Sequence, residues 1–293
     1  MLVIDPKTIA TKDLHQYMVS AVAPRPIAWA STVDEDGNPN LAPYSFFNAF
    51  SSNPPILVFS SNRRVQGNTT KDTLHNIEKT NEVVINVVSY NVVRQMAVSS
   101  VEFPKTVNEF EKAGVTMLPS DLVKPFRVKE SPVHFECKVS QIIPLGDQGG
   151  AGHLIICDVV RMHIDENVLD EQKRIDPNKI DLMGRLGRTF YTRASGDALS
   201  NIALSQTEIV LGFDALPKHI QQSGVLTGND LGRLASLKEK PSQEAFFTLK
   251  ASDERLQKIL DIKNPIPALH EYIKECITVE NIELASKLTF LIE

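Results

Sequence analysis

Hydrophobic residues in the first two-thirds of the chain alternate with polar ones or gather in runs of strand length. Residues 133–144 (V-H-F-E-C-K-V-S-Q-I-I-P) alternate at period two, and a second long run covers residues 154–164. This period is typical of a strand that buries one face. The Gly-rich segment 146–152 separates the two runs and supplies turn residues. The pattern therefore predicts a long antiparallel hairpin.

Four shorter runs predict further strands. Residues 26–33 (P-I-A-W-A-S-T-V) and 40–48 flank the acidic turn sequence D-E-D-G-N-P, which indicates a second hairpin. Residues 56–60 and 82–88 are apolar runs bounded by polar residues, as expected of buried strands.

Helical periodicity is brief in this part of the chain. Residues 70–79, 90–98 and 107–113 predict short helices, and the last is followed by Gly114, a residue common just beyond a helix C-terminus. Because many strands are interrupted by only a few helices, the pattern favours a mainly β fold, an antiparallel barrel with helical decorations. A doubly wound parallel sheet would need helices alternating regularly with strands.

The pattern changes after about residue 196. Apolar residues now recur at helical spacing, and Ser242 and Asp253 are expected helix caps. The recurring positions include Leu256, Ile259, Leu260, Leu269, Ile273 and Ile277. We therefore predict two domains, a β domain over 1–196 and a mostly α-helical C-terminal extension over 197–293.

Composition narrows the class of protein. Hydrophobic residues make up 42% of the chain and the net charge is −5, so we expect a folded protein that does not bind nucleic acid. We see no secretory signal and no apolar run of about 18 residues, which predicts a soluble cytoplasmic protein without a membrane partner. The three cysteines and seven histidines lack metal-ligand spacing, so we expect free thiols, structural histidines and no metal.

One polar segment has the residue types of an anion site. After the run at 56–60 the chain reads S-S-N-R-R-V-Q-G-N-T-T-K-D-T before the expected helix. Arginine forks bind phosphate bidentately, and a helix N-terminus favours anions. These features fit a phosphate monoester. The alternative is an ordinary solvated loop followed by a capped helix, because no known phosphate-loop signature is present.

Motifs for side-chain catalysis are not found. The chain contains no G-x-S-x-G, H-E-x-x-H or Walker motif, and no G-x-G-x-x-G follows the first strand. If the protein is an enzyme, we expect a cofactor to supply the chemistry, with no catalytic side chain.

Several blocks, in order, resemble the flavin reductase-like family, including the reductase component of nitrilotriacetate monooxygenases and flavoredoxin. The blocks are P-R-P-I-A-W-A-S-T (24–32), N-L-A-P-Y-S-F-F (40–47), N-P-P (53–55), K-D-T (71–73) with N-I (76–77), and M-G-R-L-G (183–187) with Tyr191. The resemblance covers residues 15 to 195. It implies an FMN-binding split β-barrel, with the helical extension outside the family core.

The resemblance also implies roles for particular residues. The phosphate of FMN would meet Ser61, Arg63 or Arg64, Lys71 and Thr73. Only one of the two adjacent arginines need reach it. The flavin ring would lie against residues 29–31 and 45–47, with Ser45 and Phe47 on one side of a continuous strand and Phe46 on the other. The alternative is that Trp29, Phe46 and Phe47 are core residues. The full expected cofactor-binding set is Trp29, Ala30, Ser31, Ser45, Phe46, Phe47, Ser61, Asn62, Arg63, Arg64, Lys71, Asp72, Thr73, Arg185 and Tyr191.

The family resemblance implies an NAD(P)H-dependent flavin reductase. Hydride would pass from NADH or NADPH to FMN, and reduced flavin to a monooxygenase or another acceptor protein. The family also implies a homodimer. Two alternatives remain open from the sequence: a flavoredoxin-like electron carrier, and a non-catalytic flavin-binding dimeric scaffold.

Overall fold

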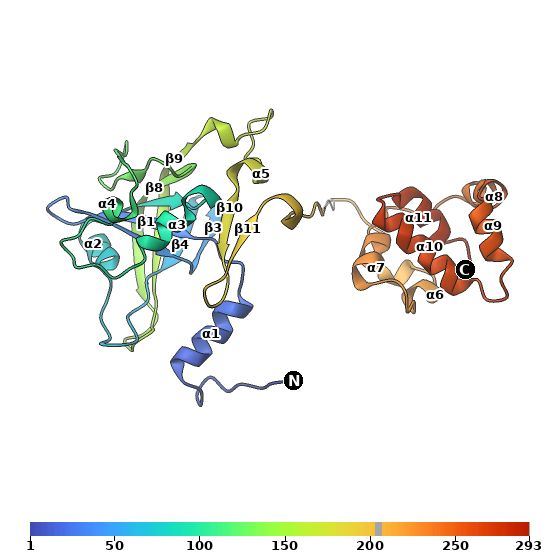
Figure 1. Ribbon diagram of the computed structural model, residues 1–293, viewed down its shortest axis with the longest axis horizontal. Coiled ribbons are helices and arrows are strands. Elements are labelled where there is room, and N and C mark those ends of the chain that lie inside the picture. The colour runs from blue at the N-terminus through green and yellow to red at the C-terminus, as the bar shows by residue number, and fades with distance from the viewer. Residues whose placement is uncertain (203–206, 293) are drawn as a thin grey trace. The chain divides into compact units, whose positions relative to one another are not determined.

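The computed structural model describes residues 1–202 and 207–292 (Figure 1). The chain divides into two compact units, Met1–Ser200 and Asn201–Glu293. We call them the β unit and the helical unit and describe each by itself. Within the described residues, no helix has both the length and the apolar composition needed to span a bilayer.

A seven-stranded antiparallel sheet forms the β unit. Its order is β2-β1-β5-β8-β9-β4-β3, so the two end strands, β2 and β3, are consecutive in the chain. Their short connection bends the sheet toward closure, which produces the split barrel. The strands are β1 (Ala28–Val33), β2 (Pro39–Tyr44), β3 (Phe47–Ser52), β4 (Pro55–Ser60), β5 (Glu82–Val87), β8 (Val133–Pro144) and β9 (His153–Ile164).

The long predicted hairpin is confirmed. β8 and β9 pair in antiparallel register from Val133 opposite Ile164 to Pro144 opposite His153. The period-two pattern made this prediction possible, because one face of each strand is buried and a register slip would expose it.

The prediction of one strand over residues 40–48 is wrong. β2 ends at Tyr44, and Ser45 and Phe46 form a bend before β3 begins at Phe47. The Phe46 carbonyl accepts a hydrogen bond from the Ser60 backbone at 2.8 Å. The bend carries the chain from one end of the sheet to the other. Residues 45–47 therefore do not form one continuous strand, and alternation cannot predict which side of the sheet each side chain faces.

Short helices decorate the sheet. The predicted ones are found as α2 (Asp72–Thr80), η1 with α3 (Tyr90–Val92 and Val93–Val98) and α4 (Glu109–Ala113), where Gly114 takes a φ of 65°. Helix α1 (Thr11–Ala21) was not predicted; only one of its residues, Val19, is buried. The remaining elements are β6 (Met117–Leu118), β7 (Arg127–Val128), η2 (Glu166–Val168), α5 (Pro177–Ile180), β10 (Leu182–Arg185), β11 (Tyr191–Ala194) and η3 (Gly196–Ala198).

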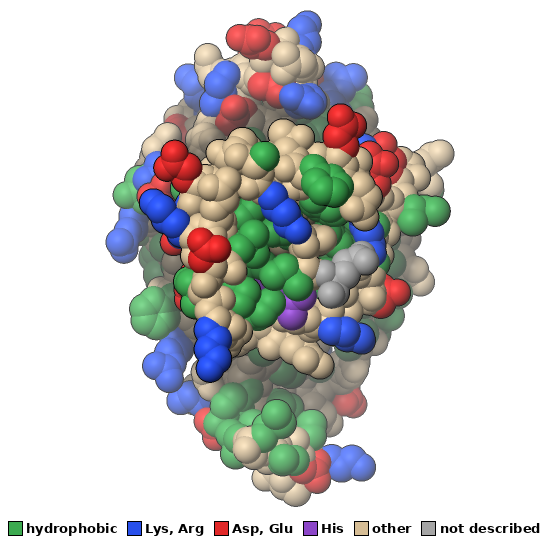
Figure 2. All heavy atoms as spheres, turned by 90° about the vertical axis from the view of Figure 1, so that its right-hand side faces the viewer, with side chains coloured by type: hydrophobic (Ala, Val, Ile, Leu, Met, Phe, Trp, Pro, Cys, Tyr) green, Lys and Arg blue, Asp and Glu red, His purple; other side chains and the backbone are tan. Residues whose placement is uncertain are grey.

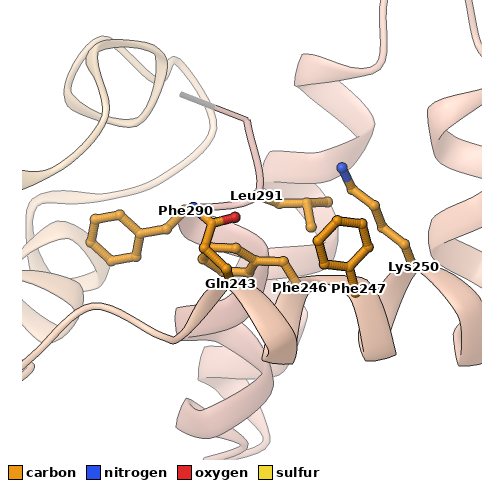
Figure 3. Close-up of a pocket in the computed structure, with 6 residues that line it drawn as sticks. All are labelled: Gln243, Phe246, Phe247, Lys250, Phe290 and Leu291. Carbon is orange, nitrogen blue, oxygen red and sulfur yellow. The ribbon is translucent and has the colours of Figure 1, made fainter.

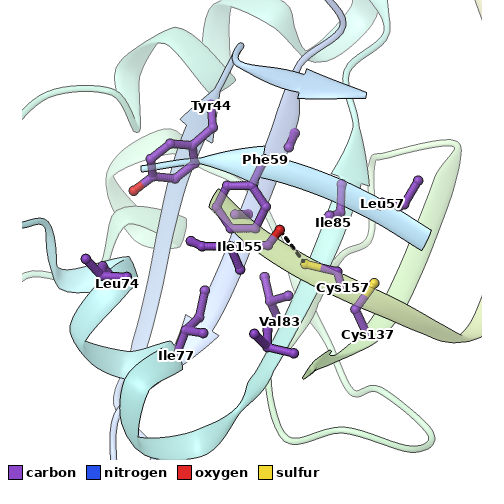
Figure 4. Packing of buried hydrophobic residues seen from close by; sticks show 13 residues of the cluster. Tyr44, Leu57, Phe59, Leu74, Ile77, Val83, Ile85, Cys137, Ile155 and Cys157 are labelled. Atoms are coloured by element: carbon purple, nitrogen blue, oxygen red, sulfur yellow. Dashed lines mark hydrogen bonds between the residues drawn. The ribbon is translucent and has the colours of Figure 1, made fainter. Parts of the chain in front are cut away.

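The barrel interior is a continuous apolar core (Figure 4). Tyr44 packs against Phe59 with ring centroids 5.2 Å apart. Cys137 and Cys157 are buried free thiols in this core, as predicted. A second core, on the side of the sheet that carries α3 and α4, surrounds Trp29, whose indole N–H donates to Ser99 Oγ at 2.8 Å.

The helical unit contains η4 (Phe213–Ala215), α6 (Lys218–Gln221), α7 (Gly228–Ala235), α8 (Gln243–Ser252), α9 (Glu254–Leu260), α10 (Ile266–Thr278) and α11 (Ile282–Thr289). Both predicted caps are confirmed: Ser242 accepts from the Ala245 N–H and Asp253 from the Leu256 N–H. Because α9, α10 and α11 each carry an apolar stripe, they bury it together in one core that includes Leu256, Leu269, Ile273 and Leu288.

Candidate functional site

The polar segment predicted to bind an anion lies between the end of β4 and the start of α2. Lys71 is the N-cap residue of α2, and its side chain makes no capping hydrogen bond. The first N–H groups of a helix have no partner within the helix and carry a partial positive charge. This end of the barrel is therefore suited to an anion.

Three buried hydroxyls converge there. Tyr44, Ser61 and Thr73 are 5%, 1% and 1% exposed. Thr73 Oγ1 accepts a hydrogen bond from Asn40, whereas Tyr44 Oη and Ser61 Oγ have no partner among the described residues. Burial raises the pKa of Tyr44, and the neighbouring Thr73 and Ser61 hydroxyls oppose that rise. The three hydroxyls therefore lie close together, although those of Tyr44 and Ser61 form no hydrogen bond with a described residue. Because buried polar groups are nearly always satisfied, these two hydroxyls are candidates for contact with a ligand.

Lys71 places a positive charge beside these hydroxyls. Its Nζ lies 5.2 Å from the centroid of the Tyr44 ring. Burial lowers the pKa of Lys71. The charge of Glu102 opposes this shift, whereas the charge of Arg64 lowers the pKa further. In the described part of the chain Lys71 forms no salt bridge, so a bound anion would be its direct counter-ion.

The two adjacent arginines diverge. Arg64 donates to the Thr70 carbonyl at 2.6 Å and to Glu102 at 2.8 Å, and its charge reaches Lys71. Arg63 turns away and donates to the side chain and carbonyl of Asn68 at 2.7 and 2.6 Å. Of the pair, Arg64 is the one placed to act with Lys71.

The turn between β8 and β9 braces this loop. The backbones of Ser61 and His153 exchange two hydrogen bonds of 3.1 Å, and Asn62 Nδ2 donates to the Gly150 carbonyl at 3.2 Å. A Cβ at Gly149 would lie 2.8 Å from the Val65 carbonyl, so only glycine permits this approach. The Asn62 side chain is thus engaged in holding the loop.

An apolar hollow lies beside the bend between β2 and β3. Its lining includes Arg25, Ser45, Phe46, Phe47 and Leu154. Arg25 Nε donates to Ser45 Oγ at 3.4 Å. A neighbouring hollow along α1 shares Phe46, Ser60 and Leu154, so the two form one groove that ends at the loop after β4. The groove reaches this loop at Asn62, the residue that follows Ser61.

Residues 29–31 do not line this groove. Trp29, Ala30 and Ser31 are all 0% exposed. β1 lies between β2 and β5 and pairs with both across these residues, so its backbone is committed to the sheet. These residues are therefore buried within the sheet, and their direct contact with a flavin stays a prediction.

Three other expected residues are dispersed. Asp72, in the first turn of α2, lines a small polar pocket with Asn40, Asn76 and Lys105. Arg185 and Tyr191 belong to the β10–β11 hairpin, where the guanidinium carbon lies 4.6 Å from the tyrosine ring centroid.

Tyr44 lies beside the predicted anion-binding residues but was not among the expected cofactor-binding residues. Tyr44 reads as a core residue of a strand, and its packing in the barrel core agrees with that interpretation. Only its unpartnered hydroxyl distinguishes it, and no sequence pattern reports hydrogen-bond satisfaction.

A group of potential metal ligands has a structural role. Side-chain atoms of Asp121, Glu136 and His163 lie within 4.8 Å of one another. Glu136 accepts from the Asp121 and Leu122 N–H groups and is 2.7 Å from His163 Nε2, while Arg161 pairs with Asp121 at 2.6 Å. These partners already use the carboxylates to anchor a loop.

The helical unit has a hollow of its own. Apolar side chains gather on one face of this unit (Figure 2). Phe246 and Phe247 of α8 line the hollow with Phe290 and Leu291, and Lys250 and Gln243 lie at its rim (Figure 3). None of the expected cofactor-binding residues is found there.

Comparisons with known proteins identify the family of the β unit. Residues 20–181 match the model of the flavin reductase like domain. An uncharacterized protein of Aquifex aeolicus is 41% identical over 184 residues, which cover 63% of this chain and 91% of that protein.

Two solved structures show the same fold. Nitrilotriacetate monooxygenase component B from Bacillus cereus is 30% identical with a TM-score of 0.63, covering 67% of this chain and 97% of its own. Flavoredoxin of Desulfovibrio vulgaris is 18% identical with a TM-score of 0.53, and the match covers 71% of this chain and 97% of that chain. This likeness supports the fold alone. The matched domain spans more than half of the chain, and the protein belongs to the flavin reductase-like family.

Proposed function

We propose that this protein binds FMN and is an NAD(P)H-dependent flavin reductase. The observation that supports this most is the pair of buried, unpartnered hydroxyls of Tyr44 and Ser61 beside the unpaired Lys71. A phosphate offers acceptors to both hydroxyls and a counter-ion to the ammonium. The residues present thus fit the phosphate end of FMN.

In this proposal Lys71, Ser61, Thr73 and Tyr44 hold the phosphate, and Arg64 strengthens the local positive field. Charge-assisted bonds to phosphate are about twice as strong as neutral ones. Arg63 and Asn62 keep the loop in shape through their bonds to Asn68 and Gly150.

The groove at the β2–β3 bend would receive the isoalloxazine ring. Phe46 and Phe47 supply apolar surface, and Arg25 with Ser45 supplies polar groups at its edge. Bound FMN would supply two-electron chemistry, accepting hydride from NADH or NADPH. The chain itself positions the two rings and excludes water, so no side-chain acid or base is required.

A homodimer would complete this groove. β3 is an end strand whose residues after Phe47 are exposed, and Phe50 is 68% exposed. A strand edge that exposes a large aromatic side chain is usually covered in a native protein. We expect Phe50→Lys to shift the protein toward monomer in analytical ultracentrifugation; an unchanged mass would contradict this interface.

The decisive experiment is an absorption spectrum followed by anaerobic addition of NADH or NADPH. A flavin band near about 450 nm that bleaches supports the reductase. Reduced flavin would then be available to a monooxygenase or another acceptor. A band that persists with both nucleotides would contradict reductase activity and favour a carrier or scaffold. Failure to retain added FMN would contradict the site itself.

A further inference from the structure

A separate cavity lies on the face of the β unit that carries α3 and the β10–β11 hairpin. Its volume is about 550 Å³, within the range of roughly 300–1,000 Å³ that small-molecule sites occupy. It shares no lining residue with the groove at the β2–β3 bend. Its main lining residues are Tyr90, Arg94, Met183, Thr189, Phe190 and Tyr191.

Two of its aromatic walls are held in place by stacked arginines. The guanidinium carbon of Arg193 lies 3.9 Å from the centroid of Tyr90, and Asp181 fixes that arginine with bonds of 2.7 and 2.6 Å. Arg185 stacks on Tyr191 at 4.6 Å. Each tyrosine is thereby oriented before any ligand arrives, which reduces the entropy lost on binding.

Arg94 differs from these two arginines. It lines the cavity, is exposed, and forms no hydrogen bond, ion pair or ring contact with any residue in the described ranges 1–202 and 207–292. Phe190, beside it in the lining, is 61% exposed. A free guanidinium and uncovered aromatic surface therefore occur in one cavity.

We propose that this cavity binds a flat aromatic carboxylate. The ring would stack against Tyr90, Tyr191 and Phe190, because offset and edge-to-face aromatic pairs are favourable beyond their buried area. The carboxylate would pair with Arg94, whose planar fork matches it bidentately. Tyr191, which the family resemblance assigns to the cofactor, would contact this ligand instead, so the site would not depend on FMN binding.

The test is calorimetric titration of the full-length protein with benzoate, with and without saturating FMN. Benzamide, a neutral analogue, and cyclohexanecarboxylate, a non-aromatic acid, serve as comparison probes. We expect benzoate to bind more tightly than either. Arg94→Gln should weaken benzoate binding about tenfold and leave benzamide unchanged. Phe190→Ala should weaken both aromatic probes.

Arg188→Gln is the matched control, because it removes the same charge from the loop of the β10–β11 hairpin without touching the cavity lining. No benzoate binding, equal affinity for cyclohexanecarboxylate, or native affinity in Arg94→Gln would overturn the proposal. Competition between benzoate and FMN would also overturn it as a separate site. Flavin retention, read by absorbance on the same samples, reports independently on the proposed FMN site.

Discussion

The two units differ in how completely their buried polar side chains are hydrogen-bonded. In the β unit, Ser31 Oγ, Tyr44 Oη, Ser61 Oγ and His134 Nδ1 are buried without a hydrogen-bond partner among the described residues. In the helical unit, the buried His270 has a partner at each ring nitrogen. An unsatisfied buried group costs about 1–3 kcal/mol. Two of these groups, Tyr44 and Ser61, lie beside Lys71, which forms no salt bridge with a described residue, and this combination supports the proposed ligand site. The completed hydrogen bonds of His270 support a structural role.

The bonds of the helical unit form a continuous chain. His219 Nε2 lies 2.8 Å from the Ile292 carbonyl, which can only accept, so this nitrogen carries the proton. His219 Nδ1 then accepts from His270 Nε2 at 3.0 Å. His270 Nδ1 in turn accepts from Ser223 Oγ at 2.8 Å. This series of hydrogen bonds links α6, α10 and the segment after α11.

The largest effect is expected at the anion site of the β unit. Lys71→Ala combined with Thr73→Ala should weaken FMN binding by two orders of magnitude or more, because each bond to a charged group contributes about 1.5–3 kcal/mol. Fluorescence titration of FMN measures this. Lys79→Ala, in the last turn of the same helix, is the control. Native affinity in a folded double variant would refute the phosphate site.

The second-largest effect is expected when the series of hydrogen bonds in the helical unit is interrupted. His270→Leu should lower the free energy of unfolding by about 2–3 kcal/mol, because it leaves His219 and Ser223 without their partner. Urea denaturation followed by circular dichroism measures this loss. Glu271→Leu introduces the same side chain at an exposed position of α10 and should change little. Equal stability of the two variants would show that this series of hydrogen bonds contributes nothing to the free energy of unfolding.

Acid should weaken the helical unit through His270. Burial and the neighbouring His219 lower the pKa of His270 below the usual value of 6.5. The unfolded state therefore binds the proton more readily, and stability falls as pH drops from 6.5 toward the folded pKa, by at most about 1.4 kcal/mol per pH unit for one proton. Hydrogen exchange of α10 amides between pH 7 and pH 5 reports this. A pH-independent exchange free energy would contradict it.

The smallest effect is expected from Tyr44→Phe, which tests whether the unpartnered hydroxyl binds a ligand. Tyr44→Phe removes an unpartnered hydroxyl, so the flavin-free protein should lose no stability. FMN affinity should nevertheless fall about fivefold to tenfold, equivalent to about 1 kcal/mol. Thermal melts and flavin titration measure the two quantities, with the exposed Tyr17→Phe as control. Unchanged flavin affinity would remove Tyr44 from the proposed site.

The sequence by itself determined the elements whose pattern is local. The β8–β9 hairpin follows from period-two alternation, and the starts of α8 and α9 follow from Ser242 and Asp253. The polar loop before α2 could also be recognised, because its residue types are those that bind anions.

Only the tertiary structure decided which residues meet. The break at Ser45 and Phe46 arises because β2 and β3 occupy opposite ends of one sheet, which depends on pairing with distant strands. The same pairing buries Trp29 and directs Tyr44 into the core. Local periodicity reports which face of an element is apolar. Hydrogen-bond satisfaction depends on atoms brought together from distant segments, so the unpartnered hydroxyls of Tyr44 and Ser61 can be identified only in the folded chain.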